Sequence, residues 1–244
     1  RKDFPTHELF SVLLASSVII LTGLIDDILE LKPRQKMFGI FVASLVVYFL
    51  AGIKVRELSL PFLGHIQLGW WSFPLTIFWI LALTNAVNLI DGLDGLATGV
   101  TLISLVTMGI VGFFFLKSWQ HYVPIMCIML AACLLGFLPY NFHPAKIFLG
   151  DTGALYIGFM ISVLSLKGLK NVTFVSLLVP ILILGVPITD TVYAMIRRKL
   201  NKKNISQADK HHLHHQLMRM GLSHRQTVLA IYGISLIFSF VSLL

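Results

Sequence analysis

The sequence of 244 residues is poor in charge, because Asp, Glu, Lys and Arg make up only 12 % of it. Soluble domains carry roughly 25 % charged residues, so too few charges are present to cover a globule with a hydrated surface. Apolar residues make up 57 % of the chain, and its mean hydropathy is +0.85. This excludes a disordered chain, which requires low hydrophobicity. The composition therefore predicts an integral membrane protein.

The small number of cysteines and the absence of nucleotide-binding motifs exclude two further classes of protein. The two cysteines, Cys127 and Cys133, lie in one apolar run, which predicts two thiols in lipid and no disulfide framework. Neither a Walker A sequence nor a G-x-G-x-x-G motif is present, so a soluble nucleotide-binding fold is unsupported. The formal net charge of +8 is typical of cytoplasmic loops that face anionic head groups. We therefore expect membrane lipids, and no nucleic acid, among the partners.

Long apolar runs occupy most of the chain. A spanning helix needs about 20 mostly apolar residues, and this rule predicts an all-α integral membrane protein, a polytopic bundle of about eight transmembrane helices. The predicted spans are Leu9–Ile25, Met37–Ile53, Phe73–Leu89, Leu96–Leu116, Tyr122–Leu138, Gly153–Leu166, Thr173–Val192 and Gln226–Leu244. Without repeats or a second domain, residues 1–244 are expected to form a single transmembrane domain. We also expect N-terminal spans of a longer protein to precede Arg1.

The loops assign the two sides of the membrane. Each span changes the side, so the loop Asp26–Lys36 shares its side with the segments around Asp91, Asp151 and 190–225. This side holds 12 of the 19 basic residues, and the positive-inside rule makes it cytoplasmic. Six carboxylates lie at or near span ends there: Asp26, Asp27, Asp91, Asp94, Asp151 and Asp190. A carboxylate beside hydrocarbon is unfavourable unless paired, metal-bound or hydrated, so we expect these acids to meet around a common partner.

Five of these six acids occur in three short motifs, each with a plain structural alternative. Asp26 and Asp27 end an apolar helix, where acids oppose the helix dipole; a solvated helix end is the alternative. From Asn85 to Asp94, polar groups recur at every third residue, so neighbouring pairs share a face if the segment is helical. Their oxygen atoms suit Mg²⁺, although turn residues after a helix are the alternative. Asp151, flanked by glycines, is equally well interpreted as a helix N-cap.

The last predicted cytoplasmic loop is basic and rich in histidine. It contains Arg197, Arg198, Lys199, His211, His212, His214 and His215. Zinc is one alternative for clustered histidines, but no cysteine or carboxylate ligand pattern accompanies them, and a solvated basic loop is another. Imidazole groups beside Arg and Lys would more naturally hold phosphates. His224, in contrast, is expected to be an isolated loop histidine.

Together these residues predict a site for a metal-bridged phosphate at the cytoplasmic membrane surface. The reaction class is phosphoryl transfer between a water-soluble and a membrane-bound substrate. A multi-span transporter is the rival from another class, but its ionisable residues should lie near the bilayer midplane. A CDP-alcohol phosphotransferase would carry Asp-Gly-x-x-Ala-Arg, which is absent, and a non-catalytic scaffold leaves the acids unexplained.

Four blocks resemble, in their order, the polyprenyl-phosphate N-acetylhexosamine-1-phosphate transferases of glycosyltransferase family 4. They are Gly23-Leu-Ile-Asp26-Asp27, Asn85-Ala-Val-Asn88-Leu-Ile-Asp91-Gly-Leu-Asp94-Gly95, Phe148-Leu-Gly-Asp151-Thr-Gly and His212-Leu-His214-His215. The resemblance implies transfer of GlcNAc-1-phosphate from UDP-GlcNAc to undecaprenyl phosphate, with release of UMP and with Mg²⁺ or Mn²⁺ as cofactor. It also implies a catalytic domain in the bacterial plasma membrane with a cytoplasmic active site, and a homodimer is a further expectation.

The form of the last block is similar to the GlcNAc branch of the family. With Asp209 and Lys210 before it, the block most resembles the enzymes that start wall teichoic acid synthesis, a step of cell-wall biogenesis. The phospho-MurNAc-pentapeptide translocase of peptidoglycan synthesis is the alternative within the family.

The resemblance further implies roles for single residues. It makes Asp26, Asp27, Asp91 and Asp94 catalytic, with Asp26 our choice as proton acceptor from the lipid phosphate, and it makes Asp151 and Asn88 metal ligands. Asn141 and Phe148 match positions associated with the uracil base. The expected contacts to the nucleotide-sugar are His212, His214 and His215, joined by Arg197 and Arg198 of the same loop.

Overall fold

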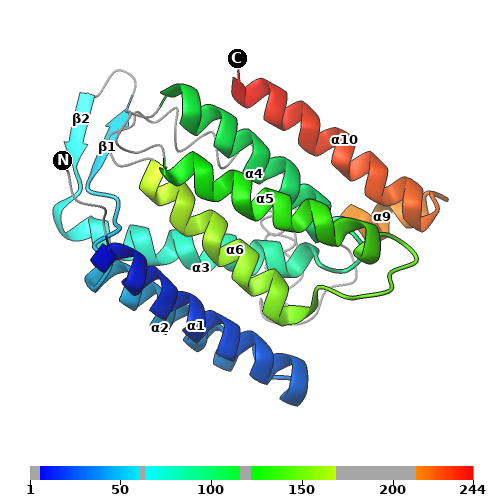
Figure 1. Ribbon diagram of the computed structural model, residues 1–244, viewed down its shortest axis with the longest axis horizontal. Coiled ribbons are helices and arrows are strands. Elements are labelled where there is room, and N and C mark those ends of the chain that lie inside the picture. Colours follow the sequence, from blue (N-terminus) through cyan, green and yellow to red (C-terminus); the bar gives the residue numbers. More distant parts are fainter. Residues whose placement is uncertain (1–5, 61–63, 116–121, 169–212, 244) are drawn as a thin grey trace, which may run out of the picture. The chain divides into compact units, whose positions relative to one another are not determined.

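The computed structural model of the protein describes residues 6–60, 64–115, 122–168 and 213–243 (Figure 1). Their elements are α1 (Thr6–Leu29), α2 (Pro33–Phe49), β1 (Glu57–Leu60), β2 (Gly64–Gln67), η1 (Gly69–Trp71), α3 (Ser72–Ile90), α4 (Leu96–Phe115), α5 (Tyr122–Asn141), α6 (Gly150–Gly168), α9 (Leu213–Arg219) and α10 (His224–Leu243). The chain divides into two compact units. The first comprises Arg1–Asn85 and Gly150–Leu177, and the second comprises Ala86–Leu149 and Leu178–Leu244.

Five helices in the described part of the chain are long and apolar enough to cross a membrane. They are Thr6–Leu29, Gly69–Ile90, Leu96–Phe114, Tyr122–Asn141 and His224–Ser242, and each coincides with a predicted span. Helices α2 and α6 also form where spans are predicted, although α6 carries Asp151 in its first turn and Lys167 in its last. The predicted span Thr173–Val192 lies outside the described residues. The helical membrane protein expected from composition is therefore confirmed.

A short β-hairpin is the departure from an all-helical chain within the described ranges. β1 and β2 pair antiparallel, with Glu57 opposite Gln67 and Leu60 opposite Gly64. The hairpin belongs to the long loop predicted between the second and third spans. Just before it, the backbone N–H of Val55 donates to Oγ1 of Thr76 in α3 at 3.1 Å, which ties the loop to the first unit.

In the first unit, α1 packs against both α2 and α6. Figure 1 shows α1 and α2 side by side in blue. Small and β-branched side chains fill the contact, because α1 buries Ala15 and Ile19 and α2 buries Ile40, Ala43 and Val47. From α6, Leu155 and Phe159 are fully buried. Small residues let helix backbones approach closely where lipid provides no hydrophobic driving force between helices.

In the second unit, α4 packs against α5 and α10. Its core contains Ile90, Leu96, Ala97, Val100, Val228 and Ile231. Polar groups on α4 and α10 find partners within the bundle: Oγ1 of Thr107 donates to Oγ of Ser239 at 2.9 Å, and the Tyr232 hydroxyl donates to the carbonyl oxygen of Gly95. Such contacts satisfy polar atoms that lipid cannot hydrate.

Candidate active site

The turn between α1 and α2 is built around the carboxylate of Asp26. Helix α1 ends at Leu29, Glu30 adopts a positive φ of 48°, and the N–H of Leu31 donates to Oδ1 of Asp26 at 2.8 Å. Pro33 begins α2 with the fixed φ that suits a first helical turn. This tight reversal brings Lys36 back to Asp26, and the Lys36 ammonium forms an ion pair with Oδ2 of Asp26.

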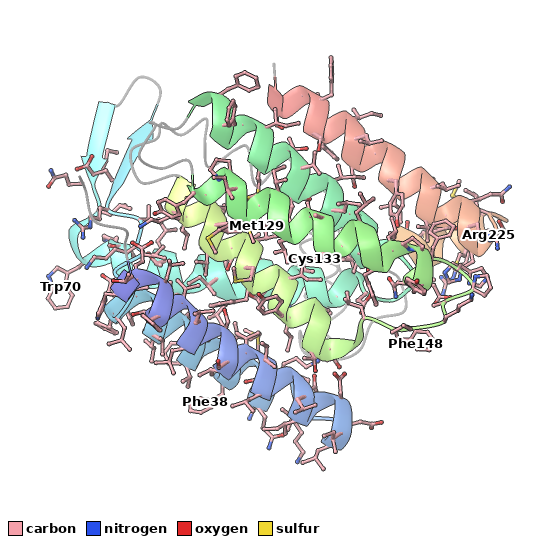
Figure 2. The ribbon with its side chains drawn as sticks, in the orientation of Figure 1. Phe38, Trp70, Met129, Cys133, Phe148 and Arg225 are labelled. Carbon is pink, nitrogen blue, oxygen red and sulfur yellow. The ribbon has the colours of Figure 1, made fainter. Side chains whose placement is uncertain are left out.

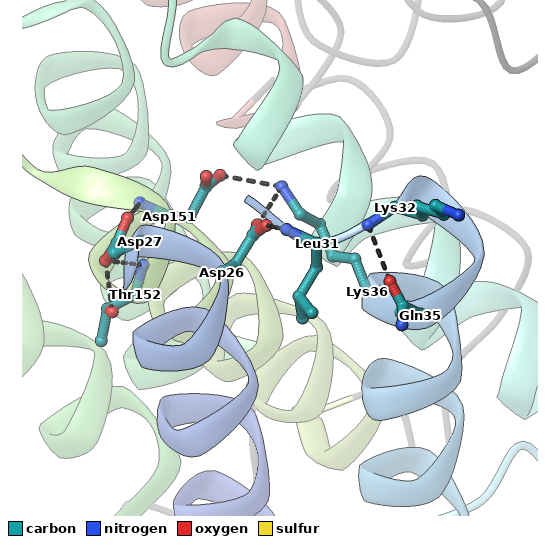
Figure 3. Close-up of polar contacts among 8 residues, drawn as sticks. All are labelled: Asp26, Asp27, Leu31, Lys32, Gln35, Lys36, Asp151 and Thr152. Atoms are coloured by element: carbon teal, nitrogen blue, oxygen red, sulfur yellow. Dashed lines mark hydrogen bonds and ion pairs between the residues drawn. The ribbon is translucent and has the colours of Figure 1, made fainter. Parts of the chain in front are cut away.

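The carboxylate of Asp27 caps the beginning of α6. It accepts hydrogen bonds from the N–H of Asp151 at 2.8 Å and from the N–H and Oγ1 of Thr152 at 3.1 and 2.5 Å (Figure 3). An acid at the end of α1 opposes the dipole of its own helix. The same acid is favourable at the N-terminus of α6, where amide groups point outward. The neighbouring helix therefore explains a placement that looks unfavourable in the sequence.

Two glycines make this contact possible. A Cβ atom on Gly23 would lie 2.4 Å from Cα of Thr152, so only glycine lets α6 begin against α1 at this point. Gly150, the first residue of α6, has a φ of 68°, and a Cβ there would approach Oδ2 of Asp27 to 3.1 Å. Glycine adopts this left-handed conformation without the steric cost that other residues meet.

Lys36 links the two ends of the acid cluster. Its Nζ lies 3.0 Å from Oδ1 of Asp151 and also contacts Asp26, so one ammonium group bridges two carboxylates (Figure 3). Burial lowers the pKa of Lys36, but hydrogen bonds and charge attraction from Asp26 and Asp151 outweigh it and raise the pKa above its ordinary value. Lys36 therefore stays a cation that holds Asp26 and Asp151 together.

The cluster in the first unit is acidic overall and offers oxygen ligands. The carboxylates of Asp26, Asp27 and Asp151 against one Lys36 ammonium leave a formal charge of −2. Asp26 is only 4 % exposed, whereas the Asp151 side chain is 36 % exposed. Hard oxygen donors with excess negative charge fit Mg²⁺ or Mn²⁺, which need few protein carboxylates and keep several waters. Asp26 is buried and both oxygens of Asp27 accept hydrogen bonds from α6, so the more exposed Asp151 is the carboxylate best placed to take an ion from water.

In the second unit, Asp94 contacts the loop between α5 and α6. Its Oδ2 lies 2.9 Å from Nδ1 of His143 and 3.1 Å from the N–H of Ala145. Burial raises the pKa of Asp94. The hydrogen bonds from His143 and Ala145 act in the opposite direction and outweigh burial, so the pKa lies below its ordinary value. The resemblance implies a catalytic role for Asp94, which stays a prediction. In the structure its carboxylate holds this loop.

Asn88 and Asp91 also belong to the second unit. Helix α3 ends at Ile90, so Asn88 is helical while Asp91 and Asp94 lie in the turn that leads to α4. Gly95 at the end of this turn has a φ of 80°. The predicted polar stripe therefore does not continue along one helix, because the glycine-rich segment after Ile90 leaves the helical path. The catalytic and metal-binding roles of Asp91 and Asn88 stay predictions.

The two residues expected at the uracil base differ in accessibility. Phe148 is 72 % exposed, whereas Asn141 is 2 % exposed. Oδ1 of Asn141 accepts from Oγ1 of Thr98 at 2.6 Å, and Nδ2 of Asn141 donates to the carbonyl of Ile147 at 3.0 Å. Asn141 thus fixes the end of the loop that carries Phe148, and a base contact by either residue stays a prediction.

His224 is not isolated, contrary to the sequence-based expectation. Its ring stacks on His143 with centroids 4.0 Å apart and planes 16° apart. Asp94, His143 and His224 bring possible ligand atoms within 4.8 Å of one another. Nearly parallel rings, however, direct their in-plane lone pairs side by side rather than toward one point. Since Nδ1 of His143 also contacts Asp94, these three residues form a stacked and hydrogen-bonded contact rather than a tetrahedral metal site.

The basic, histidine-rich loop is only partly described. His214 and His215 lie in α9, whereas Arg197, Arg198 and His212 lie outside the described residues. The nucleotide-sugar contacts expected from this loop stay predictions.

Sequence reasoning missed Lys36, His143 and Arg225. Lys36 counted only as one of the basic residues that orient the membrane topology, although the three basic residues within Lys32–Lys36, in the same short loop as Asp26 and Asp27, were a usable signal. No local pattern marks His143 or Arg225. Their contacts join α10 to a loop about 80 residues earlier in the chain, and single-sequence spacing carries no such information.

An apolar helical protein with an acidic cluster at its helix ends, suited to a divalent cation, belongs to the class of membrane-embedded enzymes or transporters. The comparison with protein families narrows this class: residues 9–169 match the model of glycosyl transferase family 4. The chain belongs to that family, as its motifs predicted, and membership counts against the transporter.

The curated proteins that this chain resembles carry names typical of the same family. The chain is 48 % identical over 231 residues to the probable undecaprenyl-phosphate N-acetylglucosaminyl 1-phosphate transferase of Bacillus subtilis, covering 94 % of this chain and 63 % of that protein. It is 36 % identical to the decaprenyl-phosphate N-acetylglucosaminephosphotransferase of Mycobacterium tuberculosis (91 % and 60 % covered). It is 35 % identical to the phospho-N-acetylmuramoyl-pentapeptide-transferase of Clostridium botulinum (85 % and 66 % covered). The chain thus spans about three fifths to two thirds of these relatives.

Proposed function

We propose that the protein transfers N-acetylglucosamine-1-phosphate from UDP-GlcNAc to undecaprenyl phosphate. The products are undecaprenyl-diphospho-GlcNAc and UMP, and the reaction is the first membrane step of a cell-wall polymer such as teichoic acid. Family membership and the name of the 48 % identical relative support this reaction. The observation that carries the proposal is the meeting of three carboxylates at the joined ends of α1, α2 and α6: Lys36 bridges Asp26 and Asp151, and Asp27 accepts from the N–H of Asp151.

The proposed chemistry joins two phosphates directly. A phosphate oxygen of the lipid attacks the phosphorus that bears the sugar, a new P–O bond forms, and the bond to the bridging oxygen breaks as UMP leaves. Two anionic substrates must approach each other, so the barrier is largely electrostatic. A divalent ion held by Asp151 would neutralise charge on the pyrophosphate when bound. The metal-binding role of Asn88 stays a separate prediction.

The proposal also defines what the chain's own residues do. Both oxygens of Asp26 are engaged, one by the N–H of Leu31 and the other by Lys36. For Asp26 to accept a proton from the lipid phosphate, the Lys36 ammonium must first leave it. The same movement would present a cation to the arriving phosphate. Asp27 would keep α6 in place through its contacts with the N–H groups of Asp151 and Thr152.

The site is expected at the cytoplasmic face of a bacterial plasma membrane. The excess of basic residues in loops on that side supports this orientation. UDP-sugars are water-soluble and lipid phosphates lie at the membrane surface, so a cluster at helix ends is suited to both substrates. The length of the prenyl chain and a homodimer stay predictions.

A UMP-release assay in detergent tests the proposal. The purified protein is given undecaprenyl phosphate, Mg²⁺ and either UDP-GlcNAc or UDP-MurNAc-pentapeptide. We expect UMP only with UDP-GlcNAc, loss of the reaction in EDTA, and recovery with Mg²⁺ or Mn²⁺. Release with the pentapeptide donor alone would instead assign the second family activity, and transfer undiminished in EDTA would exclude the divalent ion. No release with either donor would reject the proposed function.

A further inference from the structure

The loop between α5 and α6 is held by contacts from several elements of the second unit. Residues 142–149 contain no helix or strand, yet the N–H of Lys146 donates to the carbonyl of Tyr140 at 2.8 Å. Asn141 donates to Ile147, and Asp94 accepts from His143 and Ala145. The loop therefore has contacts from its own helix and from the turn before α4.

The N-terminus of α10 adds a third set of contacts. Nε of Arg225 donates to the backbone carbonyl of His143 at 3.0 Å, and the ring of His224 stacks on the ring of His143. Figure 2 shows Arg225 at the start of α10 and Phe148 on the loop, at the same end of the second unit. Arg225 therefore contacts the loop near its start, at His143, from a helix other than the two that the loop connects.

The start of α10 is itself fixed. Ser223 and Gln226 form a reciprocal cap, because the N–H of Ser223 donates to Oε1 of Gln226 at 2.9 Å and the N–H of Gln226 donates to Oγ of Ser223 at 3.4 Å. Such a capping box defines the first turn of a helix. His224 and Arg225 lie between the two capping residues, so their side chains start from a rigid backbone.

We propose that Arg225 and His224 are positioning residues for the nucleotide-sugar, acting by holding the loop 142–149 so that exposed Phe148 is preorganised for the base. This inference rests on the proposed function. Phe148 is 72 % exposed and has little packing of its own, so its position depends on the loop backbone. A binding group that is ordered before the ligand arrives loses less conformational entropy on binding. Without Arg225 the loop would sample more conformations, and binding of the donor would weaken.

Three substitutions of Arg225 separate the hydrogen bond from the charge. In Arg225→Gln the amide nitrogen stands as many bonds from Cα as Nε does in arginine, so a donor is kept without the charge. Arg225→Lys keeps the charge but moves the donor one atom further, and Arg225→Met removes both. Arg56→Met, in the segment before β1, is the matched control because it removes an exposed arginine far along the chain from this loop.

The first readout is the KM for UDP-GlcNAc in the UMP-release assay. In Arg225→Met we expect it to rise about three- to tenfold, the loss typical of one hydrogen bond, with kcat and the KM for undecaprenyl phosphate within about twofold of wild type. Arg225→Gln should stay near wild type. For His224, the Ala variant should raise the KM and the Phe variant, which can still stack, should restore it. Arg56→Met should change nothing.

The second readout needs no activity. Lys146 is exposed within the loop, so trypsin cleavage after Lys146, followed by mass spectrometry, reports how often the loop opens. Cleavage should be faster in Arg225→Met and His224→Ala, and unchanged in Arg225→Gln and Arg56→Met. An unchanged KM and unchanged cleavage would overturn the proposal, as would a Lys variant that behaves like wild type beside a defective Gln variant. If Arg225→Met does not fold, the comparison of Arg225→Gln with Arg225→Lys and of His224→Ala with His224→Phe tests the proposal instead. Absence of UMP release by the wild type would reject the proposed function alone, because the cleavage readout remains.

Discussion

Helices α1 and α6 run antiparallel and exchange charged contacts at both of their ends. At one end, Glu8 in the first turn of α1 forms an ion pair with Lys167 in the last turn of α6. At the other, Asp27 near the end of α1 accepts from the first N–H groups of α6, and Asp26 and Asp151 share Lys36. The negative charges of Asp27 and Asp151 lie at the N-terminus of α6 and the positive charge of Lys167 lies at its C-terminus, where the helix dipole favours them. Glu8 and Asp26 each lie beside a lysine.

The difference between the two ends lies in how completely the charges are balanced. Glu8 and Lys167 match one to one, and the Lys167 side chain is only 7 % exposed. The opposite end keeps a formal charge of −2, and the Asp151 side chain is 36 % exposed. A balanced and buried pair stabilises a helix contact, whereas an unbalanced and accessible cluster can bind a cation. The first should respond to mutation in stability, and the second in activity.

Asp151→Asn should have the largest effect and should appear in activity alone. It replaces the proposed metal-binding carboxylate by an amide of the same shape, so kcat for UMP release should fall at least about a hundredfold. The melting temperature, followed by tryptophan fluorescence in detergent, should stay close to wild type. Near-normal turnover would remove Asp151 from the site and would break the contrast between the two ends.

Gly23→Ala should damage both properties, because it separates α6 from α1 at the acid cluster. The added methyl group would lie 2.4 Å from Cα of Thr152, so backbone must shift, and overpacking of this kind costs about 3 kcal/mol. Both the melting temperature and kcat should fall. Gly136→Ala in α5 is the control, since a Cβ there has nothing within 4 Å. Equal behaviour of the two variants would show that close approach at Gly23 is unnecessary.

The helices and the acid pair of this comparison were predictable from sequence. Apolar runs of the right length predict α1, and counting the spans predicts that Asp26, Asp27 and Asp151 lie on one side of the membrane. The unfavourable position of Asp27 at the end of α1 was a correct indication that it has a partner elsewhere. Each of these inferences depends on local composition and on counting spans, which one sequence contains.

The partners themselves were not predictable. Asp27 caps α6 instead of lying at a solvated helix end, and this contact depends on Gly23. The importance of Gly23 appears only when α6 lies against it. Lys36 reaches Asp26 because Glu30 adopts a positive φ in the turn, and a glutamate gives little sign of that conformation. The stacking of His143 on His224 joins distant segments. Pairings between distant segments depend on tertiary packing, which hydrophobic periodicity does not encode.

Glu8→Gln should give the opposite pattern to Asp151→Asn. The substitution removes the negative charge beside the buried ammonium of Lys167, and because Glu8 keeps 20 % exposure the expected loss is about 2 kcal/mol, below that of a fully buried pair. The melting temperature should fall while kcat and KM of the folded enzyme stay unchanged. Glu57→Gln, an exposed acid in β1, should leave both properties unchanged. A loss of kcat in Glu8→Gln at a temperature where the protein is folded would mean that the two ends are coupled.

Thr152→Val sharpens the comparison within the acidic end itself, and its effect should be the smallest. It removes the hydroxyl that donates to Oδ2 of Asp27 at 2.5 Å but keeps the N–H groups of Asp151 and Thr152 that contact the same carboxylate. One lost hydrogen bond predicts a destabilisation of about 1 kcal/mol. Thr152→Ser keeps the hydroxyl and should melt near wild type. If kcat stays near normal in both variants, Asp27 acts mainly as the cap of α6. If kcat falls sharply in Thr152→Val while its melting temperature stays high, Asp27 itself takes part in the reaction, and the hydroxyl orients its carboxylate.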